Sequence, residues 1–160
     1  MRKTVLALFA IMASVFPTQA QNQLLLPLGT EVPVVVDREI NAYDLKEGQM
    51  IELTTAADVK AQTGEVLIPK GSPVAVRVRT GLKQRVLANQ KRRLIIDIKE
   101  VRLTDGTKIP LYDGVVSFTA RSNTGDLDAT PLKFVNGHTL LIPMGHVMTA
   151  KVEVSQNIRK

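Results

Sequence analysis

One short segment occurs three times in this chain and constrains its fold more than any other feature. Each copy is an aliphatic residue, Pro, a variable residue, Gly and a small or polar residue, at residues 26–30, 68–72 and 142–146. Proline presets φ for the second position of a type I turn, and glycine is favoured two residues later. We therefore expect each Pro-x-Gly segment to be a turn that starts a strand.

The residues after each Pro-x-Gly segment support this expectation, because they share one register. The third, fifth and seventh positions after the glycines are Val32, Val34 and Val36, then Val74, Val76 and Val78, then Met148, Ala150 and Val152. Side chains alternate with period two along a strand, so each triplet lies on one face. These nine residues are predicted to face the core.

Further strands are indicated between the copies. Asp105-Gly106 is the strongest hairpin signal, because both residues tolerate positive φ. Leu94, Ile96 and Ile98 occupy alternate, even-numbered positions, whereas the next apolar residue, Val101, occupies an odd-numbered one. This change predicts a β-bulge near Lys99-Glu100. The sequence predicts an all-β chain with a single barrel-like or sandwich domain of about eight or nine short antiparallel strands. No substantial helix is expected in the mature chain.

Three segments are predicted to be peripheral. Residues 21–25 are expected to be a flexible lead-in, and the tail from Gln156 is expected to be frayed. Pro110 cannot donate a hydrogen bond to a neighbouring strand, so its strand is predicted to lie at an edge.

The first twenty residues have the composition of a secretory signal. Arg2 and Lys3 precede an apolar run at residues 5–16, and residues 18–20 present small side chains for cleavage before Gln21. The alternative is an uncleaved anchor, but the run is short for a hydrocarbon layer of about 30 Å. We expect a signal peptide at 1–20 and one β domain at 21–160, with its core at about 26–154, in the periplasm or outside the cell.

Positive charge is concentrated in one part of the chain. Without Arg2 and Lys3 the chain has 19 basic and 15 acidic residues, yet the stretch 77–108 alone has ten basic and three acidic ones. Its densest part is the basic segment, residues 83–93, whose candidate binding residues for an anionic partner are Lys83, Arg85, Lys91, Arg92 and Arg93.

Two interpretations of the basic segment stay open. It could be a solvated hairpin tip whose like charges prevent edge-to-edge aggregation. It could also contact anionic lipid headgroups, lipopolysaccharide phosphates or an acidic protein partner. Nucleic acid is not expected, because export removes the usual partner and no aromatic stacking platform accompanies the charge.

The residues give no indication of an enzyme. Cysteine is absent, and the two histidines, His138 and His146, are eight residues apart without further ligand spacing. The serines lack a nucleophile-elbow context, and the carboxylates are scattered singly. We therefore expect no catalytic residues, no metal and no other cofactor.

Several stretches together resemble a known family. The stretches LPLGTEVPVVVDREI, DVKAQTGEVLIPKGSPVAVRV and VRLTDGTKIPL are similar to the periplasmic β-barrel domain of TrbI-type conjugation and type IV secretion scaffold proteins. With the third copy, GHTLLIPMGHVMTAKVEV, the chain more closely resembles small exported bacterial proteins of unknown function. The scaffolds carry a transmembrane helix, a proline-rich linker and a pore-forming helical insertion. Here the region of the insertion, residues 116–135, is short and polar, which does not favour a pore role.

The resemblance implies a β scaffold that assembles through strand edges, and it implies no catalytic residues. We therefore expect a non-enzymatic periplasmic interaction module, a structural or assembly component of the cell envelope or of a conjugation or secretion apparatus, with an envelope protein as partner. The alternative is a carrier or sensor that binds a small ligand in the barrel mouth. Whether the chain forms an oligomer stays open.

Overall fold

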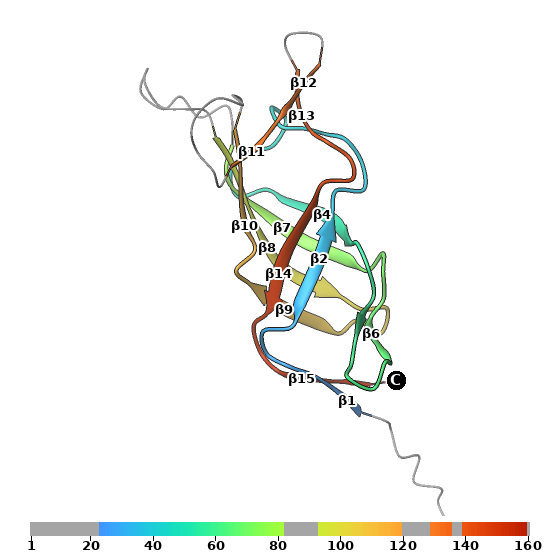
Figure 1. Ribbon diagram of the computed structural model, residues 1–160. Coiled ribbons are helices and arrows are strands. Elements are labelled where there is room, and N and C mark those ends of the chain that lie inside the picture. The colour runs from blue at the N-terminus through green and yellow to red at the C-terminus, as the bar shows by residue number, and fades with distance from the viewer. Residues whose placement is uncertain (1–22, 82–92, 120–128, 136–138, 160) are drawn as a thin grey trace, which may run out of the picture.

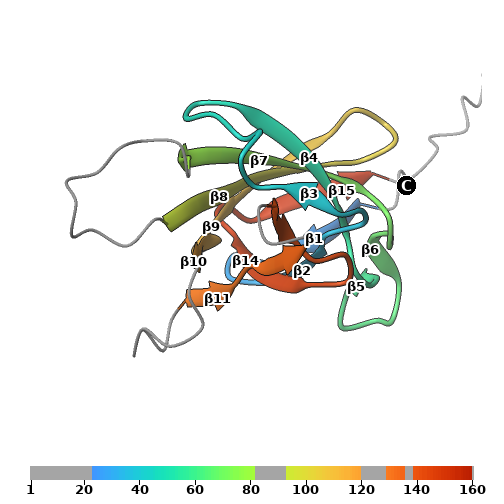
Figure 2. The same ribbon diagram turned by 90° about the horizontal axis from the view of Figure 1, so that it is seen from above.

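The computed structural model describes residues 23–81, 93–119, 129–135 and 139–159 of the chain. Every regular element in these ranges is a β-strand, and six of the strands form a closed antiparallel barrel (Figures 1 and 2). In order around the barrel they are β2 (Glu31–Val35), β4 (Met50–Thr55), β7 (Pro73–Thr80), β8 (Arg93–Arg102), β9 (Lys108–Tyr112) and β14 (Val147–Val152). The all-β prediction is confirmed. Within the described ranges no helix has the length and apolarity needed to span a bilayer.

The described ranges contain nine further strands of two to five residues around the barrel. At one end β1 (Gln23–Leu26) pairs with β15 (Gln156–Arg159), and at the other end β3 (Ile40–Asn41), β12 (Lys133–Val135) and β13 (Thr139–Ile142) form a small sheet (Figure 1). A hairpin of β5 (Val59–Lys60) and β6 (Val66–Ile68) lies beside the barrel. The remaining two, β10 (Val115–Thr119) and β11 (Ala129–Pro131), extend the sheet from β8, and they form a parallel pair. The described strands therefore outnumber the predicted eight or nine. The strands outside the barrel are only two to five residues long, which is too short for a clear alternating pattern in the sequence.

The predicted core residues are buried. Val34, Val76 and Ala150 are each 0% exposed, and the most exposed of the nine residues, Met148, is at 5%. Together with aliphatic residues of β4, β8 and β9 they form one continuous core. The shared register after each Pro-x-Gly segment thus places one aliphatic face of β2, β7 and β14 inside the barrel.

The three Pro-x-Gly segments form the same turn, but the predicted type I turn is wrong. In each copy the proline carbonyl accepts a hydrogen bond from the N–H three residues later: Thr30 to Pro27 at 3.3 Å, Ser72 to Pro69 at 3.2 Å and His146 to Pro143 at 3.4 Å. Proline is therefore the first residue of the turn, and glycine is the third. The three glycines have φ of +78°, +81° and +84°, whereas the residue before each has no positive φ. This combination defines a type II turn.

Each turn continues into a β-bulge at the start of the strand that follows it, opposite one residue of the neighbouring strand. Gly29 N–H donates to the carbonyl of Val152, and Val152 N–H donates back to the carbonyl of Thr30. The same exchange joins Gly71 and Ser72 to Thr55, and Gly145 and His146 to Val36. In each case the glycine and the residue after it lie opposite a single residue of the neighbouring strand. The glycine is the first of the two and has a left-handed φ, so the arrangement is a G1 bulge. Glycine is needed here because a side chain would be strained at this φ.

Two other local predictions are confirmed. Ala75 pairs with Glu100 and Val76 pairs with Ile98, so Lys99 is an extra residue in β8. The Asp105-Gly106 turn joins β8 to β9, and Leu103 N–H donates to Thr107 across it at 2.9 Å. Asp105 accepts hydrogen bonds from the Thr107 backbone N–H and hydroxyl, which lower the pKa of its carboxyl group.

The predictions for the chain ends were wrong. Residues 23–26 and 156–159 pair with each other, Gln23 opposite Arg159 and Leu26 opposite Gln156. Leu26 is 0% exposed and Ile158 is 4% exposed, so the pair covers the core at this end of the barrel. Local pattern could not reveal this, because each short segment is stabilised by a partner more than a hundred residues away in sequence.

The edge prediction for Pro110 was also wrong. β9 pairs with β8 on one side and with β14 on the other, and this second pairing closes the barrel. The carbonyl of Pro110 accepts a hydrogen bond from Glu153 at 2.9 Å, just beyond the end of β14. In an antiparallel pair the N–H and the carbonyl of one residue point to the same neighbouring strand, so the N–H that proline lacks would point toward Glu153. The pairing of β9 with β14 ends there, so the missing donor is tolerated.

Gly114 tests how tightly the barrel is packed. A Cβ atom there would lie 2.7 Å from Ile98 Cβ and 2.9 Å from Ala150 Cβ, and both neighbours are fixed to strand backbone. We expect Gly114→Ala to lower the free energy of unfolding by about 2 kcal/mol, because the strands must separate to admit the methyl group. Urea denaturation measures this. The adjacent exposed residue provides a control, since Val115→Ala should change stability by less than about 0.5 kcal/mol; equal effects would contradict the packing argument.

Candidate functional site

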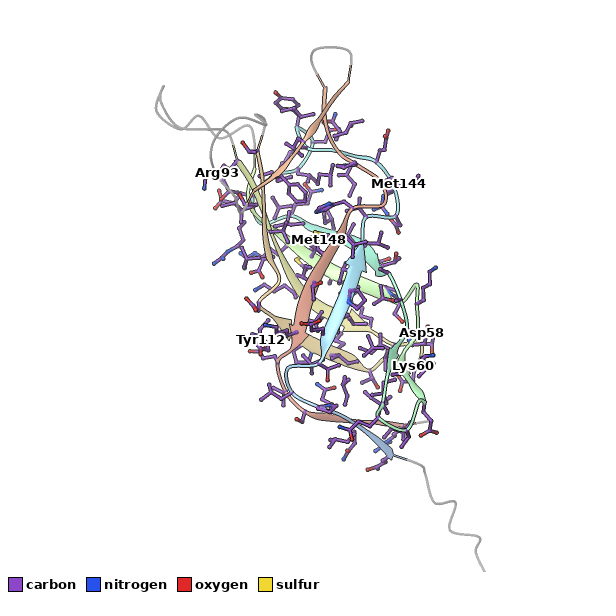
Figure 3. All side chains as sticks on the ribbon, in the orientation of Figure 1. Asp58, Lys60, Arg93, Tyr112, Met144 and Met148 are labelled. Atoms are coloured by element: carbon purple, nitrogen blue, oxygen red, sulfur yellow. The ribbon has the colours of Figure 1, made fainter. Side chains whose placement is uncertain are left out.

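Only one of the five predicted binding residues lies in the described part of the chain. Arg93 is the first residue of β8, is exposed and already takes part in an interaction (Figure 3). Lys83, Arg85, Lys91 and Arg92 lie outside the described residues. In sequence they connect the end of β7 to the start of β8, so the surface of this strand pair is the part of the site that can be described.

The outer face of β7 and β8 carries a cationic pocket with a volume of about 320 Å³. It is lined by Glu47, Gly48, Arg77, Val78, Arg79, Asp97 and Lys99. Three cations and two carboxylates give the lining a net charge of +1. The two carboxylates therefore offset most, but not all, of the positive charge.

Asp97 organises this pocket. Its Oδ2 atom lies 2.6 Å from Lys99 Nζ and 3.9 Å from Arg79 Nε. The Asp97 side chain is 12% exposed, whereas those of Lys99 and Arg79 are 45% and 56% exposed. The two cations thus cover a nearly buried carboxylate and present their own outer surfaces to solvent.

Two β-bulges explain why these cations converge. Lys99 is the extra residue in β8, and Arg79 is an extra residue in β7, between Val78 paired with Ile96 and Thr80 paired with Ile95. A bulge bends its strand and changes the direction of the bulged side chain. Here the two bulges lie on opposite sides of Asp97 and direct both side chains to it.

Arg77 is the cation without a carboxylate of its own. Arg77 is exposed, and its backbone pairs in register with Asp97 of β8. Its side chain forms no ion pair with any residue in the described ranges. Its guanidinium group can therefore bind an external anion without first breaking a salt bridge. Arg77, Arg79 and Lys99 belong to the basic stretch 77–108, but the sequence alone does not predict that they line one pocket. The bulge predicted near Lys99 was the one signal that pointed to this place.

The barrel interior is filled with aliphatic side chains. Leu53, Ile96 and Ile98 are 0% exposed, as are Val32 and Val74 from other strands. A core packed in this way resembles the interior of small closed barrels, in which side chains fill the available space. The outer surface is therefore where the described residues offer a place for a partner.

One of the two histidines lies at a Pro-x-Gly turn. His146 is half-buried, and its ring packs edge-on against Phe118 with centroids 5.5 Å apart. Burial lowers its pKa below the ordinary value of 6.5. His138 lies outside the described residues. In the described ranges no three side chains of His, Cys, Asp or Glu come together in a way that could hold a metal ion.

His146 should make stability depend on pH. Its folded-state pKa lies below its unfolded value, so the unfolded state binds more protons as pH falls from about 6.5, and stability is lost there. We expect the urea midpoint to fall between pH 7.5 and 5.5, and to fall less for His146→Gln. The difference between the two profiles reports the contribution of His146. Parallel pH profiles for the two proteins would contradict the assignment.

Comparison of the chain with protein-family models gives no match, and comparison with curated proteins gives none either. The likeness to TrbI-type scaffold domains therefore rests on the sequence stretches quoted above.

Proposed function

We propose that this chain is a non-enzymatic interaction module of the cell envelope, exported to the periplasm or beyond, and that the β7–β8 end of its barrel binds an anionic partner. The observation that carries the proposal is the cationic pocket on β7 and β8, with the basic segment connecting the same two strands. Arg77 remains available to an incoming anion, and four more basic residues follow in the connecting sequence.

The packed interior supports an interaction module in preference to a small-ligand carrier. The described interior consists of buried aliphatic side chains, which offer few of the convergent polar groups that orient a small ligand in its site. A partner bound at the outer surface needs no such groups in the interior. Several described strands also have an unpaired edge, among them β1 and β15 in their two-stranded sheet, and such edges can accept a strand from another protein.

The resemblance to TrbI-type scaffolds supports a place in a conjugation or secretion apparatus. It suggests an assembly role with an envelope protein as partner, and association of the chain with further copies of itself is compatible with this role. The same proposal includes the phosphates of lipid or lipopolysaccharide as a second anionic surface for the basic segment.

The basic segment provides the direct test. Replacement of Lys91, Arg92 and Arg93 by Ser should reduce co-sedimentation of the protein with envelope fractions at least tenfold at low salt, because each basic residue near an anionic surface contributes about 1 kcal/mol. Replacement of Lys60, Lys70 and Lys108 by Ser removes the same charge from exposed positions elsewhere and should have little effect. Unchanged sedimentation of the first variant would refute the proposal.

Export has its own test. The proposed signal predicts that the protein recovered from the cell envelope or medium begins at Gln21, which intact-mass and amino-terminal analysis can establish. A membrane-bound product that retains Arg2 and Lys3 would instead support the anchor.

A further inference from the structure

A row of four residues crosses the outer face of the barrel through the cationic pocket. Met50 of β4 pairs in register with Arg77 of β7, Arg77 pairs with Asp97 of β8, and Asp97 pairs with Val115 of β10. These four strands are consecutive in the sheet (Figure 1). Directly opposed residues have side chains on the same face, so the row forms one continuous strip of surface.

The two ends of this row are apolar and exposed. Met50 is 53% exposed and Val115 is 52% exposed, whereas the two central residues are the exposed Arg77 and the nearly buried Asp97. Neighbouring strands are about 4.8 Å apart, so the row is about 14 Å long, and the Arg77 backbone is about 5 Å from that of Met50 and about 10 Å from that of Val115. Arg and Met are residue types enriched in protein interfaces.

An extended peptide has matching dimensions. It advances about 3.3 Å per residue and directs alternate side chains to the same side, so its residues i, i+2 and i+4 lie about 6.6 Å apart. An acidic residue at i+2 could then reach Arg77 while apolar residues at i and i+4 contact Met50 and Val115. The middle of such a peptide lies about 2 Å from the strand of Arg77, an offset that the long arginine side chain can span, so the charge and both apolar contacts can form at one register.

The charges of the pocket favour a single carboxylate. Asp97 and Glu47 reduce the net charge of the lining to +1, so a doubly charged phosphate would meet repulsion after its first charge is neutralised. A membrane surface attracts proteins through many cations acting together, which this net charge does not supply. A protein segment with one acidic residue between two apolar ones matches both the charge and the exposed ends of the row.

On this basis, and resting on the proposed interaction function, we infer that the row Met50–Arg77–Asp97–Val115 recognises an extended acidic segment of a partner protein with the pattern apolar-x-Asp/Glu-x-apolar. Arg77 binds the carboxylate, and Asp97 holds Lys99 and Arg79 in place beside it. The segment crosses the strands instead of adding to a sheet edge. This mode of binding leaves the barrel hydrogen bonds unchanged.

The test is an NMR titration of the purified, isotope-labelled protein with the capped peptide Ser-Leu-Ser-Glu-Ser-Leu-Ser. We expect saturable shifts centred on the amides of Arg77 and Asp97. Replacement of the peptide Glu by Gln, or of both Leu by Ser, should weaken binding at least fivefold, because each removes one of the matched contacts. Arg77→Gln and Met50→Ser should each weaken it similarly, whereas the control Arg159→Gln on β15 should not.

Three outcomes would overturn the inference. They are the absence of saturable shifts, equal binding of the Glu and Gln peptides, and Arg77-dependent binding to vesicles with about 30% anionic lipid but not to the peptide. The Lys91, Arg92 and Arg93 variant separates this inference from the proposed function. If that variant loses envelope binding while Arg77→Gln keeps both envelope and peptide binding, the proposed function stands and the row is not the recognition site.

Discussion

The barrel depends on a reciprocal pair of backbone hydrogen bonds that is formed at all three Pro-x-Gly turns. In each case a glycine N–H donates to the carbonyl of a residue at the end of a neighbouring strand (Val152 and Thr55) or just beyond it (Val36), and that residue donates back to the carbonyl after the glycine. The turns before β2 and β14 bind the ends of each other's strands, so this pair is fixed at both ends. The turn before β7 fixes β4 in the same way. These contacts fix the register of two barrel pairings, β2 with β14 and β4 with β7.

A fixed register explains why the interior can be filled so completely. Inward side chains of β2 and β14 meet as Val32 with Ala150 and Val34 with Met148, which alternates residues of different size across the pair. Gly114 then lies where Ile98 and Ala150 leave no space for a side chain. On the outer face, the bulges at Arg79 and Lys99 place two cations around Asp97.

Period-two alternation made the barrel strands and their inward faces predictable, and a change of parity located the Lys99 bulge. The turn type was not predictable in the same way, because proline is compatible with more than one turn position and only the hydrogen bonds decide between them. The β1–β15 pair and the closure through Pro110 depend on partners far away in sequence. The row through the pocket could not be predicted for the same reason: Met50, Arg77, Asp97 and Val115 become neighbours only when the register of four strands is known.

The β1–β15 pair also has a mechanical consequence. Because these strands are antiparallel and Gln23 lies opposite Arg159, the two ends of the described domain leave it side by side. Tension between them would separate the strands sequentially from this outermost pairing, with each step breaking few hydrogen bonds. The barrel strands would bear load only after Leu26 and Gln156 had come apart. This end of the domain would therefore yield at low force and protect the rest.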